Sequence, residues 1–164
     1  GMKFHLFAII FSLAGACAFA ADVAENAGLK VKLPAGWTKA EAGGEALKVK
    51  HETLAANVLI SKVPKAEAAS PLAFLQDYVK RVGLKKESDQ AIEDPAPVKT
   101  GAREGASAVL VYAKKDGTKN FQRMYVFPSK ADGIYLVAIC TAPAKKFPEL
   151  KQAFQEIVDS LSEE

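Results

Sequence analysis

Residues 107–141 read SAVLVYAKKDGTKNFQRMYVFPSKADGIYLVAICT, and this stretch decides the fold class. It holds three runs rich in β-branched and aromatic residues, at 107–113, 120–127 and 134–141. Asp116-Gly117 and Asp132-Gly133 separate the runs, and an Asp-Gly pair between apolar runs is a strong signal for a β-hairpin. The stretch therefore predicts three consecutive antiparallel strands.

The first and third of these runs are apolar at consecutive positions, as in Val109-Leu110-Val111-Tyr112. A strand with one face in water alternates apolar and polar residues, so we expect these strands to be covered on both faces. Two amphipathic helices, predicted at 70–82 and 145–161, are available as covers. Ser70-Pro71 begins the first helix, because serine is a good N-cap and proline suits the first helical position.

Apolar residues alternate with lysine in two upstream segments, 29–33 and 47–51, and an apolar run follows at 57–63. Each predicts a strand. Residues 84–104 are polar and contain prolines, which indicates a long connection with short extended pieces near Ile92 and Val98. The chain is thus expected to form a single α+β domain over residues 21–164. We expect an antiparallel sheet of about six strands with helices on both faces.

This order of elements, with Leu33-Pro34-Ala35-Gly36-Trp37 closing the first strand, resembles the PsbP-like superfamily. The closing stretch, Gly133-Ile134-Tyr135-Leu136 to Thr141-Ala142-Pro143 and then Phe147 and Ser160-Leu161, fits the same pattern. That group includes the extrinsic photosystem II subunit PsbP, the Mog-type Ran-binding factor and DcrB-like bacterial envelope proteins. The resemblance implies a non-enzymatic binding or adaptor protein. It implies no site residues, since none of the members' functional motifs occurs here.

The first 20 residues have the features of a secretory signal. Lys3 is followed by an apolar run at 6–14, and Ala18-Phe19-Ala20 is a small-x-small cleavage site. Gly1, ahead of Met2, is read as a remnant of cloning. An alternative is lipid anchoring through Cys17, although Leu13 stands one position too early for that motif. We therefore expect a periplasmic or secreted protein with no transmembrane segment after the signal.

Catalytic motifs such as G-x-S-x-G, G-x-x-x-x-G-K-[ST] and H-E-x-x-H do not occur in the sequence. After signal cleavage the one histidine is His51 and the one cysteine is Cys140. We interpret His51 as a partly exposed strand residue and Cys140 as a small buried hydrophobic residue. Glu93-Asp94 precedes a proline, as in a solvated loop. The sequence thus predicts no enzyme, no metal site and no cofactor.

Four lysines carry the most specific functional hypothesis. Lys30 and Lys32 share one face of the first strand, and Lys48 and Lys50 share one face of the second. If the two strands pair, four like charges crowd one face, which is unfavourable unless that face holds an anion. The other interpretation is that the lysines protect an edge strand from aggregation.

Trp37, the only tryptophan, is either a cap on the core or an exposed anchor for a partner. The formal charge of +3 is too small to indicate nucleic-acid binding. We conclude that the sequence describes an exported, non-catalytic domain that binds an envelope protein or an anionic surface. The alternative is a periplasmic carrier that holds a small molecule or lipid between a helix and the sheet.

Overall fold

The computed structural model describes residues 22–82 and 93–164, so the predicted signal with Cys17 lies outside the described residues. The elements are β1 (Val23–Asn26), β2 (Leu29–Lys32), β3 (Trp37–Ala40), β4 (Ala46–His51), β5 (Asn57–Pro64), α1 (Pro71–Arg81), β6 (Ala96–Thr100), β7 (Arg103–Ala113), β8 (Lys119–Pro128), β9 (Ile134–Pro143), α2 (Phe147–Asp159) and β10 (Ser162–Glu163). Within these two ranges, no helix combines the length and apolar character needed to span a bilayer.

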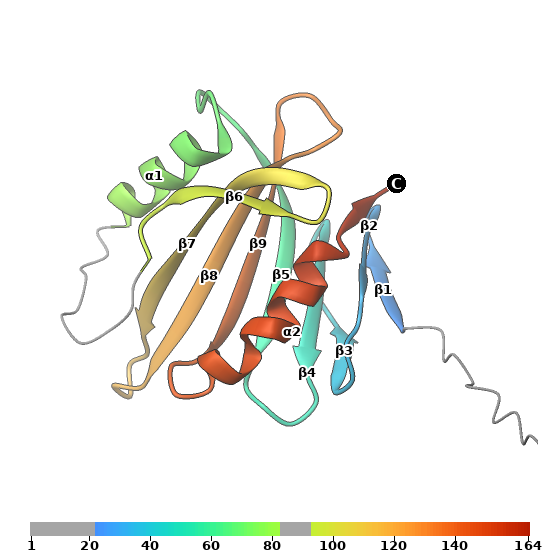
Figure 1. The fold of residues 1–164 in the computed structure, drawn as a ribbon, viewed down its shortest axis with the longest axis vertical. Helices are drawn as coiled ribbons and strands as arrows, with labels where there is room; N and C mark the ends of the chain where they lie inside the picture. Colours follow the sequence, from blue (N-terminus) through green and yellow to red (C-terminus); the bar gives the residue numbers. More distant parts are fainter. Residues whose placement is uncertain (1–21, 83–92) are drawn as a thin grey trace, which may run out of the picture.

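Seven strands form one antiparallel sheet in the order β3-β4-β5-β9-β8-β7-β6 (Figure 1). The predicted meander of β7, β8 and β9 lies in the middle of this sheet, so the expected α+β antiparallel fold is confirmed. A second sheet of three strands, β1-β2-β10, was not expected. It joins the two ends of the described chain, because β10 pairs with β2.

The two helices cover opposite faces of the seven-stranded sheet. Leu75 of α1 packs with Ala108 and Leu110 of β7, whereas α2 packs on the face that carries Val109. Consecutive residues of a strand point to opposite faces, so the alternation along β7 places the helices on different sides. We call these sides the α1 face and the α2 face. Helical cover on both faces was predicted from the apolar runs.

Local sequence explains where α1 begins. Ser70 caps it: its hydroxyl oxygen accepts the Ala73 N–H at 3.1 Å, and Pro71 follows as the first helical residue. The predicted end of the helix at Gly83 and the extended piece expected near Ile92 lie outside the described residues.

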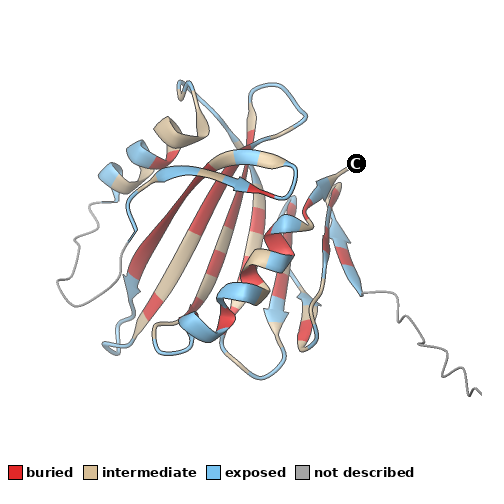
Figure 2. Cartoon of the chain, in the orientation of Figure 1, coloured by how far each residue is buried: buried red, intermediate tan, exposed pale blue. Residues whose placement is uncertain are grey.

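The α2 face is closed by more than the helix. Phe154 and Ile157 of α2 are 1% and 0% exposed, and Leu29 and Val31 of β2 are 0% exposed in the same core. In Figure 2 the buried segments run along α2 and the strands beneath it. The small sheet therefore extends the cover that α2 gives, and this explains why the strand at 29–32 leaves the main sheet.

The β6–β7 hairpin forms one edge of the main sheet, and this edge bends over the α2 side of the other strands (Figure 1). Two glycines allow the close approach. A Cβ on Gly101, whose φ is +59°, would lie 2.7 Å from the Asp159 carbonyl oxygen of α2, and a Cβ on Gly105 would collide with the Val126 carbonyl oxygen of β8. Glycine is required at both positions because any side chain would displace backbone.

Glu163 of β10 fastens the C-terminal strand to two hairpins. Its carboxylate accepts hydrogen bonds from the Ser129 hydroxyl at 2.6 Å, the Lys130 N–H at 3.2 Å and Arg103 at 3.2 Å. Burial alone would raise the pKa of Glu163, but these three donors together outweigh it and hold the pKa below the ordinary value. We call Glu163 with its partners Ser129, Lys130 and Arg103 the Glu163 clasp. It holds the C-terminal strand in place beside the α2 face.

Candidate functional site

The two lysine-bearing strands do not pair, so the expected face of four lysines is not formed. In β2, Lys30 stands opposite Glu25 of β1 and Ser162 of β10. In β4, Lys48 and Lys50 stand opposite Ala40 and Thr38 of β3. The prediction failed because β3, which follows Gly36, was not recognised as a strand and takes the place beside β4 that was assigned to β2.

Trp37 lies in the core and not on the surface. It is 5% exposed, and its ring meets the Phe154 ring edge-on at 5.7 Å and the His51 ring at 5.4 Å. The interpretation as a core cap therefore fits the structure, and the alternative of an exposed anchor is excluded by burial.

The contacts of His51 and Cys140, the two residues with catalytic potential, are those of residues that support the fold. The His51 Nδ1 accepts the backbone N–H groups of Thr53 at 3.2 Å and Leu54 at 3.0 Å, which orders the turn after β4. Cys140 is fully buried, and burial raises the pKa of its thiol far above the ordinary value. The His51 Nδ1 thus serves as a hydrogen-bond acceptor within its own turn, and a buried neutral thiol is a poor nucleophile.

Lys48 and Lys50 do line a cavity, together with Lys39 and Lys114, which our sequence analysis did not single out. The Lys39 ammonium is already engaged, because it donates to the Glu25 carbonyl oxygen at 2.7 Å. On the α1 face, beyond the part that α1 covers, a hollow of about 650 Å³ is lined by β4, β5, β9, β8 and the β7–β8 turn. Lys48, Lys50 and Lys114 bring positive charge to it, and Asn57, Asn120 and Thr141 bring polar groups. We call this cavity the lysine hollow.

The lysine hollow carries more positive than negative charge, although Asp116 lies close enough to Lys114 for the two charges to attract each other. Among the residues that the structure describes, no carboxylate forms an ion pair with Lys48, Lys50 or Lys114, and Glu41 is the one acidic residue of the lining. Asn120 is 9% exposed. Among the described residues, the one buried side-chain polar atom without a partner is the Thr100 hydroxyl, so the Asn120 amide is not a buried unpaired group.

Sequence reasoning missed Lys114, Asn57, Asn120 and Thr141. Asn57, Asn120 and Thr141 lie in or beside the predicted strands, so alternation alone could have placed each on a face. Their convergence depends on the strand order β4-β5-β9-β8, which brings β5 next to β9 although α1, β6, β7 and β8 intervene in the chain.

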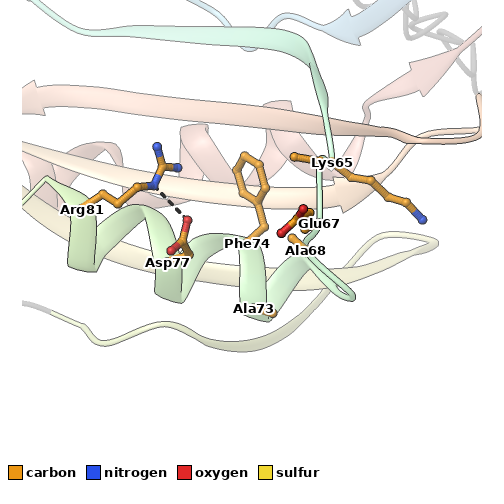
Figure 3. Close-up of a pocket in the computed structure, with 8 residues that line it drawn as sticks. Lys65, Glu67, Ala68, Ala73, Phe74, Asp77 and Arg81 are labelled. Atoms are coloured by element: carbon orange, nitrogen blue, oxygen red, sulfur yellow. Dashed lines mark hydrogen bonds and ion pairs between the residues drawn. The ribbon is translucent and has the colours of Figure 1, made fainter.

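A second cavity, of about 540 Å³, lies between α1 and the connection that leads into it (Figure 3). Phe74 forms its apolar wall and meets the Tyr135 ring edge-on at 5.5 Å. Lys65, Glu67 and an Asp77–Arg81 ion pair of 2.8 Å stand around it. The expected crevice lay between a helix and the sheet, whereas this cavity lies between a helix and a connection.

Groups of three or more His, Cys, Asp or Glu side chains that could hold a metal ion are not found in residues 22–82 and 93–164. Glu93, which was read as a solvated loop residue, forms an ion pair of 2.7 Å with Arg123, while half of its side chain remains exposed.

Comparison with protein-family models gives no match, and a search of curated proteins also gives none. Solved structures do match. A protein from Bacteroides thetaiotaomicron aligns with a TM-score of 0.57 at 14% identity over 85% of this chain, which spans only 47% of that protein. The Ran-binding protein Mog1p of Saccharomyces cerevisiae aligns with a TM-score of 0.57 at 11% identity, over 87% of this chain and 96% of Mog1p.

LpqN of Mycobacterium tuberculosis, described as involved in cell envelope biogenesis, aligns with a TM-score of 0.53 at 17% identity over 82% of each chain. At such identities the similarity establishes the fold and not an activity. The chain has the fold of Mog1p and LpqN, and a Mog1-like fold is what the order of its strands and helices led us to expect.

Proposed function

We propose that the protein is an exported, non-catalytic binding protein of a bacterial envelope that docks an acidic protein partner on the lysine hollow. The observation that carries this proposal is the convergence of Lys48, Lys50 and Lys114 on one hollow that also has a polar lining. None of the three lysines forms an ion pair with a described residue. Export is proposed from the signal sequence at 1–20.

Charge complementarity is the physical basis of this proposal. Three ammonium groups around one hollow raise the local positive potential, which steers and orients an acidic partner. Lys30 and Lys32 lie in the other sheet, so they form a natural comparison group. A non-catalytic role is in keeping with the structural surroundings of His51 and Cys140.

The test is a crosslinked pull-down from the envelope fraction of the source cells, read by mass spectrometry. The bait is the tagged chain, the test variant carries Lys48→Glu and Lys50→Glu, and the matched control carries Lys30→Glu and Lys32→Glu. We expect one stoichiometric protein that the control retains and the test variant loses. Thermal unfolding of all three baits checks that each is folded.

Two results would contradict the proposal. One is retention of the partner by the Lys48→Glu, Lys50→Glu variant at physiological salt. The other is binding that does not weaken as ionic strength rises, because a contact made by exposed lysines is screened by salt.

A carrier function is the second candidate, and the cavity beside α1 in Figure 3 is the observation that favours it. Its volume of about 540 Å³ lies within the range of small-molecule sites. Native mass spectrometry of the purified protein should then show a bound metabolite or lipid, which Phe74→Trp would expel by filling the cavity. Protein purified from its own envelope without any bound molecule would remove this candidate.

A further inference from the structure

A straight row of polar side chains crosses the open part of the α1 face. The strand register aligns Thr38 of β3 with Lys50 of β4, Lys50 with Asn57 of β5, Asn57 with Thr141 of β9, and Thr141 with Gln122 of β8. Side chains directly opposite one another in an antiparallel sheet share a face. At about 4.8 Å between strands, the five side chains span roughly 19 Å.

The rows on either side have different chemistry. On the side nearer α1, Lys48, Leu59 and Ile139 are aligned, and all three are partly exposed. Leu59 belongs to neither of the two buried cores, and part of its apolar surface is open to solvent. On the other side, Asn120 stands opposite Tyr112, whose side chain is 53% exposed.

The polar row suits a ligand that both donates and accepts hydrogen bonds. The threonine hydroxyls and the Asn and Gln amides can each do both, whereas a carboxylate or phosphate only accepts. The one bond inside the row, from Gln122 to the Thr141 hydroxyl, is long at 3.4 Å, so a ligand can replace it at little cost. A polypeptide backbone offers N–H and C=O groups in alternation.

We infer that the lysine hollow and these rows bind an extended, acidic segment of a polypeptide, laid across β8, β9, β5 and β4. Its carboxylates meet Lys48, Lys50 and Lys114, its backbone meets Asn57 and Thr141, and its apolar side chains rest on Leu59. At roughly 3.3 Å per residue, about six residues cover the row. This inference rests on the proposed function and names the chemistry of the partner at that site.

An anionic lipid surface or a free phosphate would use the same lysines. Neither would need the row of amides and hydroxyls, and a headgroup would leave Leu59 unused. The apolar row beside the charges therefore favours a polypeptide, and a lipid or phosphate becomes an outcome of the test.

The experiment is a titration of the ¹⁵N-labelled protein with a seven-residue peptide of alternating glutamate and leucine, followed by NMR. Hexaglutamate, inorganic phosphate and phosphatidylglycerol vesicles are the comparison probes. We expect the side-chain NH₂ signals of Asn57, Asn120 and Gln122 to shift with the peptide, while that of Gln152 on α2 does not. Hexaglutamate should bind more weakly, because it has no apolar side chain for Leu59.

Two substitutions in the polar row measure its contribution to peptide binding separately from that of the lysine charges. Asn57→Ala and Thr141→Val should each weaken peptide binding roughly three- to tenfold, the effect of one lost hydrogen bond. The matched control Gln152→Ala, which removes an exposed amide from α2, should leave the affinity unchanged.

The outcomes distinguish this inference from the proposed function. If Lys48→Glu with Lys50→Glu abolishes partner capture but the two row substitutions leave peptide binding unchanged, the hollow is an anion site and the extended segment is refuted. Vesicle or phosphate binding without peptide binding refutes it as well. If charge reversal leaves partner capture intact, the proposed function itself fails.

Discussion

The two faces of the seven-stranded sheet are built differently. The α2 face is closed by α2, the small sheet, the β6–β7 hairpin and the Glu163 clasp, and its side chains interlock in one apolar core. The α1 face carries an apolar core only where α1 lies, and beyond it the side chains are lysines, amides and hydroxyls. One sheet thus stabilises the fold on one side and carries on the other the polar surface where we propose that a partner binds.

The largest expected effect comes from truncating the closed face. Phe154→Ala should lower the free energy of unfolding by about 3–5 kcal/mol, because Phe154 is 1% exposed and its ring contacts the rings of Trp37 and Phe147. Urea unfolding, followed by Trp37 fluorescence, measures the change. Leu59→Ala on the open face should cost about 1 kcal/mol or less, since Leu59 is partly exposed. Equal losses of unfolding free energy in the two variants would contradict our description of one face as stabilising and the other as open.

The clasp should give a smaller effect that depends on pH. Glu163→Gln should lower the free energy of unfolding by about 1.5–3 kcal/mol at pH 7, because it removes a charged acceptor from three donors.

The pKa of Glu163 is lower in the folded than in the unfolded protein, so its contribution is complete above the unfolded pKa. It is then lost as the pH falls through the folded pKa. Urea unfolding between pH 7 and pH 3 should therefore show the two proteins converging in stability toward acid. A constant difference would contradict the clasp.

The rate at which a thiol reagent modifies Cys140 measures how tightly the α2 face is closed, and it needs no substitution. It is fully buried and its thiol pKa is raised by burial, so a thiol reagent at neutral pH should modify the native protein only as it opens. The same reagent should react quickly in urea. Rapid modification of the folded protein would show that the α2 face is less closed than we describe.

The smallest effect on stability is expected in the lysine hollow. Lys50→Ala should change the free energy of unfolding by less than about 0.5 kcal/mol, because Lys50 is exposed and has no ion pair with a described residue. The same substitution should weaken partner binding and reduce its dependence on salt. A loss of stability comparable to that of Glu163→Gln would instead make Lys50 a structural residue.

Local patterns were sufficient for most of the elements. Asp-Gly pairs placed the hairpins of the meander, Ser70-Pro71 placed the start of α1, and the apolar stripe placed α2 within two residues of its observed ends. β3 was missed because four residues with one buried side chain, Trp37, carry almost no periodic signal. β1 and β10 were not predicted either, because strands of four and two residues carry as little periodic signal. β10 exists only through its pairing with β2.

The candidate site was predicted only in part. Lys48 and Lys50 could be chosen because like charges at alternate positions of one strand are unusual, but Lys30 and Lys32 carry the same pattern and lie elsewhere. A pattern within one strand shows which residues share a face. It does not show which strand lies beside it.

The sequence by itself determined the fold class, the two-sided cover of the sheet and the identity of its helices, because these follow from periodicity and turn chemistry within short segments. Only the tertiary structure decided that β2 leaves the main sheet, that Trp37 is buried, and that Asn57, Thr141 and Gln122 align with Lys50. Such alignment is a property of strand order and register. These are set by how the chain as a whole buries its apolar surface, so no single segment encodes them.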